Sequence, residues 1–285
     1  MKFKEFIQSE EAQKPHYLLI GNPVGHSISP LMHNAALEYY GLPERYVAVE
    51  VSLPELPSLI AHFNQPSFKG ANVTIPHKEN LFDAVDVLSA EAVQIGAINT
   101  IVKQQNRLIG DNTDAYGFGV PIAQYSDILS GERAIIFGTG GATKAIFFAL
   151  KEMNIEEIVM VSRRPGNYDN TFDQSIVRCS YENWSAYADE AAIIVNATPL
   201  GMVPNTDASP VPDSDKQYLA DKICYDIVYN PRNTKFLKQA AAVGGIPIEG
   251  LDMLIYQGAK SFRLWTGKEF PVSLIKMRLE DVFPA

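Results

Sequence analysis

The sequence is poor in cysteine, in excess positive charge and in long apolar runs. Its 285 residues include two cysteines, Cys179 and Cys224, and neither has a Cys or His near it at metal-ligand spacing. We therefore expect no metal site and no disulfide-rich scaffold. Their number still permits one disulfide, but two thiols in a chain of this size are typical of a reducing cytosol.

The charge balance and the short apolar runs argue against two classes of partner. The chain carries 33 acidic against 24 basic side chains, a net charge of −9, so broad attraction to nucleic acid or an anionic membrane is not expected. Residues 1–15 lack the apolar core of a signal peptide, and no apolar run approaches the length of a membrane span. We expect a cytoplasmic monomer or homodimer whose partner is a small molecule.

The apolar pattern of the first third predicts alternating strands and helices. Hydrophobic residues make up 46% of the chain and charged residues 20%, as in folded globular proteins. Strands are expected at 17–20, 45–51 and 69–74, with helices at 29–41 and near 54–63. In the first helix, Ser29 is typical of an N-cap and Pro30 of the first helical position.

The alternation continues through the rest of the chain. Pro76 is expected to start a helix with Leu81, Val85 and Leu88 at helical spacing. Residues 97–103 and 107–109 are expected to form a hairpin. Further strands are expected at 134–137, 157–161, 191–195 and 223–228, with helices at 142–153 and from about residue 250, and four prolines predict a loop at 199–213.

This alternation predicts an α/β fold with two domains and mostly parallel sheets wrapped by helices. The first domain would comprise residues 1–113, completed by 250–285. The second, residues 114–249, would be Rossmann-like, with a cleft between the two.

A glycine-rich turn with the sequence GTGGAT begins at Gly138, after an expected strand and before an expected helix. Gly138 permits a sharp turn, and Gly140 lets the backbone approach a pyrophosphate at a helix N-terminus. Thr143 stands where the usual fingerprint has its third glycine, so Gly141 and Ala142 are expected to supply the close packing. The order of strand, turn and helix predicts a dinucleotide site.

Three polar residues, Ser162, Arg163 and Arg164, follow the next expected strand. An NAD-selective site usually has Asp or Glu at this place. Two guanidinium groups and a hydroxyl suit a 2′-phosphate instead, so the expected cofactor is NADP, with NAD still open. The competing interpretation is a pair of solvated surface arginines.

Lys78 and Asp114 each close a segment rich in amide and hydroxyl groups. A lysine and an aspartate this far apart in a sequence more often form a surface ion pair or no contact. Here the surrounding polar residues come at the C-terminal ends of expected strands, where open parallel sheets bind ligands: Ser27, Ser29, Asn72, Thr74, Asn99, Asn112 and Thr113. Uncharged donors beside one cation suit a small polyhydroxylated acid, and lysine with aspartate can transfer a proton.

Seven motifs resemble those of shikimate dehydrogenases, in the order and spacing of that family and over nearly the whole chain. They are GHSISP at 25–30, NVTIPHK at 72–78, GDNTD at 110–114, GTGGAT at 138–143, NATPLGM at 196–202, YDIVYNP at 225–231 and GLDML at 250–254.

The resemblance implies a reversible, NADP-dependent interconversion of 3-dehydroshikimate and shikimate, within chorismate and aromatic amino acid biosynthesis. Lys78 and Asp114 would be the catalytic pair that handles the proton at the 3-oxygen. The substrate-binding positions would be Ser27, Ser29, Thr74, Asn99, Tyr229 and Gln257. The cofactor-binding positions would be Gly138, Thr139, Gly140, Gly141, Ala142, Ser162, Arg163, Arg164, Ala197, Thr198, Ile227 and Gly250.

Some positions depart from the family pattern. Ala115 follows the aspartate where the family often has Gly, and SRRP at 162–165 replaces a frequent Asn-Arg-Thr. LWTGKEFP at 264–271 resembles the quinate/shikimate dehydrogenase branch. Two alternatives stay open: an enzyme with broader substrate and NAD use, and a non-catalytic sensor that binds the pathway acid and NADP.

Overall fold

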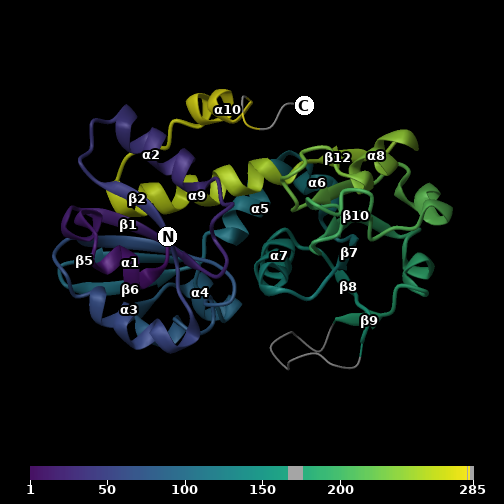
Figure 1. The fold of residues 1–285 in the computed structure, drawn as a ribbon. Coiled ribbons are helices and arrows are strands. Elements are labelled where there is room, and N and C mark those ends of the chain that lie inside the picture. Colours follow the sequence, from purple (N-terminus) through teal and green to yellow (C-terminus); the bar gives the residue numbers. More distant parts are fainter. Residues whose placement is uncertain (166–175, 281, 283–285) are drawn as a thin grey trace. The chain divides into compact units, whose positions relative to one another are not determined.

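The chain folds into two units, each with its own six-stranded sheet (Figure 1). The computed structural model describes residues 1–165, 176–280 and 282. The first unit contains Met1–Thr113 and Gln257–Arg278, and the second contains Asp114–Tyr256 and the described residues after Arg278. None of the described helices combines the length and apolar character needed to span a bilayer.

The first unit is built on a mixed sheet in the order β2-β1-β3-β5-β6-β4. Its strands are β1 (His16–Gly21), β2 (Arg45–Glu50), β3 (Phe68–Val73), β4 (Val87–Leu88), β5 (Thr100–Gln104) and β6 (Arg107–Asp111). Its helices are α1 (Phe3–Ile7), α2 (Ser29–Tyr39), α3 (Leu56–His62), α4 (Ala90–Ile95), most of α9 (Gly250–Thr266) and most of α10 (Val272–Glu280). Only β5 runs against its neighbours, β3 and β6; the other pairs are parallel.

The expected hairpin is present, and its turn explains its register. The last paired residues are Gln104 and Arg107, and the two residues between them, Gln105 and Asn106, have φ angles of 47° and 63°. Two consecutive positive φ values are typical of a type I′ turn, whose twist matches that of the strands. This two-residue turn fixes which residues of β5 and β6 face each other.

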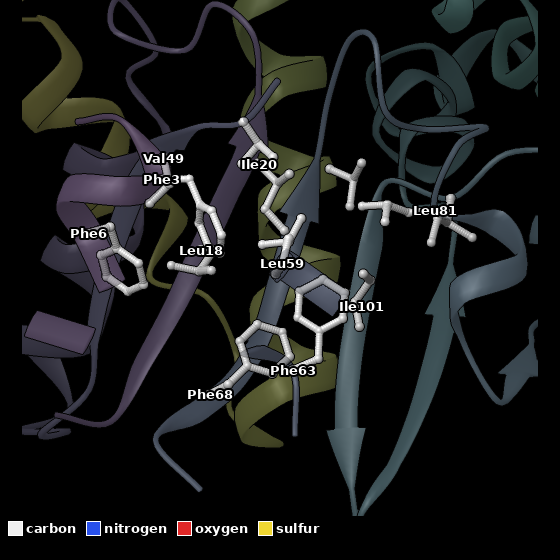
Figure 2. Packing of buried hydrophobic residues seen from close by; sticks show 14 of the residues in the cluster. Phe3, Phe6, Leu18, Ile20, Val49, Leu59, Phe63, Phe68, Leu81 and Ile101 are labelled. Carbon is white, nitrogen blue, oxygen red and sulfur yellow. The ribbon is translucent and has the colours of Figure 1, made fainter. Parts of the chain in front are cut away.

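The two faces of the first sheet bury different side chains, because strand residues alternate between faces. Leu18 and Ile20 of β1 pack in an apolar cluster with Phe3 and Phe6 of α1 (Figure 2). Tyr17, the residue before Leu18, points to the opposite face and stacks on Trp265 of α9 with ring centroids 4.6 Å apart. Helices α1 and α3 thus cover one face, and α2 and α9 cover the other (Figure 1).

Two local expectations in the first unit are wrong. The helix expected from Pro76 is replaced by turns, a short 3₁₀ segment at Phe82–Ala84 and strand β4. Pairing of β4 with β6 overrides the helical spacing, and Asp86 adds two bonds to the backbone of Leu108. Ser29 is the first helical residue rather than the N-cap, which is Ile28.

The second unit contains a fully parallel sheet in the order β12-β11-β10-β7-β8-β9. Its strands are β7 (Arg133–Phe137), β8 (Glu157–Val161), β9 (Val177–Cys179), β10 (Ala191–Asn196), β11 (Ile223–Asp226) and β12 (Ile246–Ile248). Its helices are α5 (Asp114–Ile122), α6 (Ser126–Leu129), α7 (Gly141–Glu152), α8 (Lys235–Ala242) and the start of α9. This is the doubly wound Rossmann order, which reverses between β7 and β10.

Apolar packing covers both faces of the second sheet. On one face Phe137 meets Trp184, with centroids 5.2 Å apart, beside Phe236 of α8. On the other face, Tyr225 of β11 stacks on Phe118 of α5, with ring centroids 4.6 Å apart and an interplanar angle of 9°. Because both faces of the sheet are buried, a ligand can reach it only at the strand ends, and open α/β sheets bind ligands at the carboxyl ends.

Candidate active site

Ser27 and Ser29 form a hydrogen-bonded pair after β1. The Ser27 hydroxyl donates to the Ser29 hydroxyl at 3.2 Å and accepts from the Ser29 backbone N–H at 3.2 Å. Ser29 is buried and Ser27 is half-buried. Because Ser29 does not cap α2 with its side chain, both hydroxyls can turn toward an acceptor such as a carboxylate.

Thr74 lies directly after β3 and packs against the end of β1. A Cβ atom at Gly21 would stand 2.4 Å from the Thr74 Cγ2 atom, so only glycine permits this approach. The Thr74 N–H donates to the Ile20 carbonyl at 2.8 Å. Glycine at position 21 therefore brings Thr74 to the edge of the sheet beyond which the two serines lie.

Asn99 lies at the same edge of the first sheet, but not at the C-terminal end of a strand as expected. It precedes β5, so it lies at the N-terminal end of a strand rather than at the C-terminal end. Because β5 is antiparallel to β3 and β6, its first residues lie beside the last residues of those strands. The Asn99 carbonyl accepts from Val73 at 2.7 Å, and its N–H donates to Asp111 at 3.0 Å.

A buried polar cluster ties Gln257 to this edge. Ser261, one turn after Gln257 in α9, donates to the Gln257 carbonyl at 3.0 Å and contacts the Thr100 hydroxyl at 2.8 Å. It also accepts from the Asn72 amide at 2.9 Å. The Asn99 amide lies 3.5 Å from the Gln257 side-chain oxygen. The structure thus brings Asn99 and Gln257 together at this edge of the first sheet.

Lys78 and Asp114 occupy defined places, one in each unit. Lys78 is half-buried in the turn after β3, and its carbonyl accepts from the Ile98 N–H at 3.0 Å, next to Asn99. Asp114 is buried, follows Thr113 of the first unit, and is the first residue of α5. A carboxylate is favoured at a helix N-terminus by the helix dipole. Tyr229, in the second unit, is half-buried, and burial raises the pKa of its hydroxyl.

A pocket of about 1230 Å³ opens at the carboxyl ends of the second sheet. Eight expected cofactor residues line it: Gly138, Thr139, Gly140, Ser162, Arg163, Arg164, Ala197 and Thr198. They follow β7, β8 and β10, and the strand order reverses between β7 and β10. Open α/β sheets bind ligands at such a reversal point.

Gly138 and Gly140 of the glycine-rich turn differ in why a side chain is disfavoured there. Gly138 has a φ of +107°, and a Cβ there would stand 2.9 Å from the Ala197 carbonyl oxygen. Apart from its own backbone and its two chain neighbours, Gly140 has no protein atom within 4 Å of its ideal Cβ position, so the space beside it is open. Gly138 is therefore required by the fold, whereas Gly140 leaves room for a ligand beside the first turn of α7.

The packing role expected of Gly141 is wrong. It too has open space where a Cβ would stand, so no close contact depends on it. Thr143 is fully buried instead, and its hydroxyl donates to the Gly138 carbonyl at 3.3 Å. A threonine can stand at the third fingerprint position because its hydroxyl is satisfied within the turn.

Four expected cofactor residues do not line this pocket: Gly141, Ala142, Ile227 and Gly250. Ile227 and Gly250 lie together, since a Cβ at Gly250 would stand 2.5 Å from the Ile227 carbonyl. The Ile227 N–H donates to the Asn196 carbonyl at 3.1 Å, which joins this pair to the strand that leads to Ala197.

Seven lining residues were not expected as cofactor contacts: Tyr181, Glu182, Pro199, Leu200, Ser209, Pro210 and Pro212. The first two follow β9, a three-residue strand without a clear apolar pattern. The other five lie in the proline-rich stretch 199–213, which the sequence predicts as a loop without a binding role. The sequence carries no signal that places Tyr181 at the pocket, because β9 is too short to be recognised as a strand.

Comparison with known proteins assigns the family. Residues 19–101 match the shikimate dehydrogenase substrate binding domain, and residues 250–280 match the shikimate 5′-dehydrogenase C-terminal domain. The shikimate dehydrogenase (NADP⁺) of Moorella thermoacetica is 37% identical over 276 residues, which cover 94% of this chain and 93% of the relative. The chain belongs to the shikimate dehydrogenase family.

Solved structures of the shikimate dehydrogenase family share the fold. The Thermus thermophilus shikimate 5-dehydrogenase, in complex with NADP(H) and shikimate, is 36% identical with a TM-score of 0.81, covering 94% of this chain and 100% of that one. The Listeria monocytogenes enzyme, in complex with shikimate and NAD, is 33% identical with a TM-score of 0.85, covering 94% and 96%. Both nicotinamide cofactors therefore occur in complexes of this family.

Proposed function

We propose that this chain catalyses the reversible reduction of 3-dehydroshikimate to shikimate with NADP, and that Lys78 and Asp114 handle the proton. The protein is an NADP-dependent oxidoreductase of the shikimate dehydrogenase family. The observation that carries the proposal for this chain is the pocket in which the open glycine turn and the arginine pair meet. The reaction belongs to chorismate and aromatic amino acid biosynthesis.

The pocket fits NADP by shape and by charge. Open space beside Gly140 at the start of α7 suits a pyrophosphate, since the first N–H groups of a helix attract anions. Arg163 and Arg164 line the same pocket and can hold a 2′-phosphate with forked, charge-assisted hydrogen bonds. Ala197 and Thr198, which follow β10, would line one side of the bound cofactor. NADP, when bound, supplies the hydride chemistry.

The first unit supplies groups that match a small hydroxylated acid. The paired hydroxyls of Ser27 and Ser29 would donate to the carboxylate. Thr74, Asn99 and Gln257 would hold ring hydroxyls, because each lies at one edge of the sheet and carries a hydrogen-bonding group. Tyr229 of the second unit would add a further hydroxyl contact.

Lys78 would give a proton to the substrate's 3-oxygen during reduction, and take it back during oxidation. A lysine ammonium is both a donor and a positive charge, so it also stabilises negative charge that develops on that oxygen. Asp114 would orient the ammonium and exchange the proton with it. The other residues act by fixing the orientation of the substrate.

A spectrophotometric assay tests the proposal. Shikimate and quinate are each offered with NADP and with NAD, and the appearance of reduced nicotinamide is followed. We expect the highest kcat/KM for shikimate with NADP. Equal turnover of quinate would support the quinate/shikimate alternative, and no reduction in any of the four mixtures would contradict the enzyme function and support a non-catalytic binding protein.

We propose a cytoplasmic location and a monomer or homodimer. Both Cys179 and Cys224 are buried free thiols, which suits a reducing compartment. Fractionation of cells tests the location, and sedimentation equilibrium of the purified protein tests the oligomeric state.

A further inference from the structure

A carboxylate is fully buried at the end of β11. Asp226 has no exposed surface, and its two oxygens accept three hydrogen bonds. Asn196 Nδ2 and the Val228 N–H donate to Oδ1, each at 3.0 Å, and the Thr234 hydroxyl donates to Oδ2 at 2.6 Å. All three donors are neutral. Burial raises the pKa of Asp226 to about 6, and the three hydrogen bonds oppose that rise.

Asn196, the neighbour of Asp226 on β10, organises the turn that follows its own strand. Its side-chain oxygen accepts from the Thr198 N–H at 3.0 Å and from the Thr198 hydroxyl at 2.6 Å. Its Nδ2 donates to the Leu200 carbonyl at 3.0 Å. The Thr198 hydroxyl then accepts from the Leu200 N–H at 3.1 Å. One buried amide thus holds both ends of the turn.

This turn forms a wall of the nucleotide pocket. Ala197, Thr198, Pro199 and Leu200 all line it. The Ala197 carbonyl also lies against Gly138, at 2.9 Å from the place where a Cβ would stand. A change in the conformation of residues 197–200 would therefore alter the pocket next to Gly138.

The orientation of the Asn196 amide depends on its partner. A carboxylate can only accept, so it requires the NH₂ end of Asn196 to face it. The carbonyl end must then face the N–H and hydroxyl of Thr198, which need an acceptor. A neutral residue that offers both a donor and an acceptor at position 226 would no longer require the NH₂ end of Asn196, and would leave the Thr198 N–H and the Leu200 carbonyl to fix this orientation.

We propose that Asp226 is a positioning residue for cofactor binding: it orients the Asn196 amide and thereby shapes the 197–200 wall of the nucleotide pocket. The inference rests on the proposed function, in which this pocket holds NADP. A buried, unpaired carboxylate is costly, and specifying one arrangement among several is an attested reason for keeping such a group.

Calorimetric titration of the purified protein with NADP, without substrate, tests the inference. Asp226→Asn keeps the shape of the side chain but removes its acceptor-only character. We expect the Kd for NADP to rise roughly tenfold, the effect of about one hydrogen bond, with the unfolding midpoint little changed. An unchanged Kd would overturn the inference, whereas failure of the wild-type protein to bind NADP would overturn the proposed function of the pocket itself.

Thr234→Val is the matched control. It removes a bond to the other oxygen of Asp226 and the side-chain cap of α8, but leaves Asn196 its carboxylate partner. We expect it to lower the unfolding midpoint without weakening NADP binding. If it raises the Kd as much as Asp226→Asn does, general loosening of the buried cluster explains the effect and the inference fails.

A double-variant comparison tests whether Asp226 acts through Asn196. Asn196→Ala removes the amide that Asp226 orients, so it should raise the Kd for NADP by itself. Adding Asp226→Asn should then raise it no further. A folded Asn196→Ala variant with wild-type affinity, or fully additive effects in the double variant, would overturn the inference.

Discussion

Asn99 and Thr113 hold each other by reciprocal hydrogen bonds. The Thr113 N–H donates to Asn99 Oδ1 at 2.7 Å, and Asn99 Nδ2 donates to the Thr113 hydroxyl at 2.9 Å. Both residues are buried, and Thr113 immediately precedes Asp114. The side chain proposed to bind substrate is therefore fixed by the segment that leads to the proposed catalytic aspartate.

Replacing Thr113 by Val should weaken substrate binding. The change leaves the buried Asn99 amide without one acceptor, which costs roughly 1–3 kcal/mol. We expect the KM for shikimate to rise about tenfold, while the Kd for NADP stays at its wild-type value. Thr113→Ser keeps the hydroxyl and should restore the wild-type KM; steady-state kinetics of the two variants would contradict the assignment if both behaved alike.

Lys78→Ala should lower kcat far more than it raises KM. Proton transfer by a positioned side chain contributes roughly 10²- to 10⁴-fold, and its loss should reduce kcat by that order. The matched control is Lys69→Ala on the preceding strand, whose ammonium bonds the Pro66 carbonyl. Kinetics with saturating NADP decide the matter: a Lys78→Ala enzyme with wild-type kcat would remove Lys78 from the chemistry.

Arg163→Ala and Arg164→Ala should reduce the preference for NADP over NAD. Each arginine can make charge-assisted bonds to a 2′-phosphate, worth roughly 1.5–3 kcal/mol, so the Kd for NADP should rise about 10- to 100-fold. The Kd for NAD, which lacks that phosphate, should change little. Arg107→Ala in the hairpin of the first unit is the control. Parallel loss of both affinities would mean that the arginines do not recognise the phosphate.

Two alanine substitutions in the glycine turn should separate folding from binding. Gly138→Ala forces a Cβ into a positive-φ residue beside the Ala197 carbonyl, and should cost roughly 1–3 kcal/mol of stability. Gly140→Ala meets no protein atom, so its unfolding midpoint should match the wild type while NADP affinity falls. Thermal unfolding and NADP titration of both variants check this; undiminished affinity in Gly140→Ala would exclude Gly140 from the cofactor site.

The first unit should lose stability on acidification through a histidine pair. His16 and His62 lie with their Nε2 atoms 3.0 Å apart among Phe3, Phe6 and Phe68. Burial, with the nearby charges of His16 and Lys103, lowers the pKa of His62 to about 4. Burial also lowers the pKa of His16, which faces Lys69 and Glu11.

The direction in which stability changes with pH follows from proton uptake on unfolding. The unfolded chain binds a proton near pH 6.5 and the folded chain only near pH 4, so stability is complete above 6.5 and falls as pH drops toward 4. His62→Phe should flatten this dependence in urea unfolding measured from pH 7 to pH 4, whereas His26→Phe, at an exposed ring, should not. An unchanged slope in His62→Phe would show that other groups carry the acid sensitivity.

Local sequence signals predicted most strands and the nucleotide turn, because their apolar runs and glycines act over short distances. The residues after Pro76 were mispredicted, since their spacing suits a helix while pairing of β4 with β6, set by tertiary structure, decides the outcome. The predicted hairpin already implies that β5 is antiparallel to β6. It does not reveal that this direction places Asn99, directly before β5, beside the ends of β3 and β6. Knowing that Asn99 sits at a strand start requires knowing which strands lie beside it.

The candidate site is predicted from motifs, whereas the buried groups that support it are not. Asn196 and Asp226 stood in recognised motifs, yet their mutual bond depends on the neighbouring positions of β10 and β11 in the sheet. Tyr181 was missed because β9 is too short to show a pattern. Contacts made across a sheet carry no signature in the order of residues along the chain.

The turn at Gln105 and Asn106 lies at the opposite end of β5 from Asn99, yet it helps to determine the geometry of the candidate active site. It sets the register of a strand whose first residue follows Asn99 directly. A strand shifted by one residue presents every side chain to the other face. One inserted residue in this turn, although the turn itself takes no part in the proposed chemistry, would therefore move the amide of Asn99 away from the proposed substrate site.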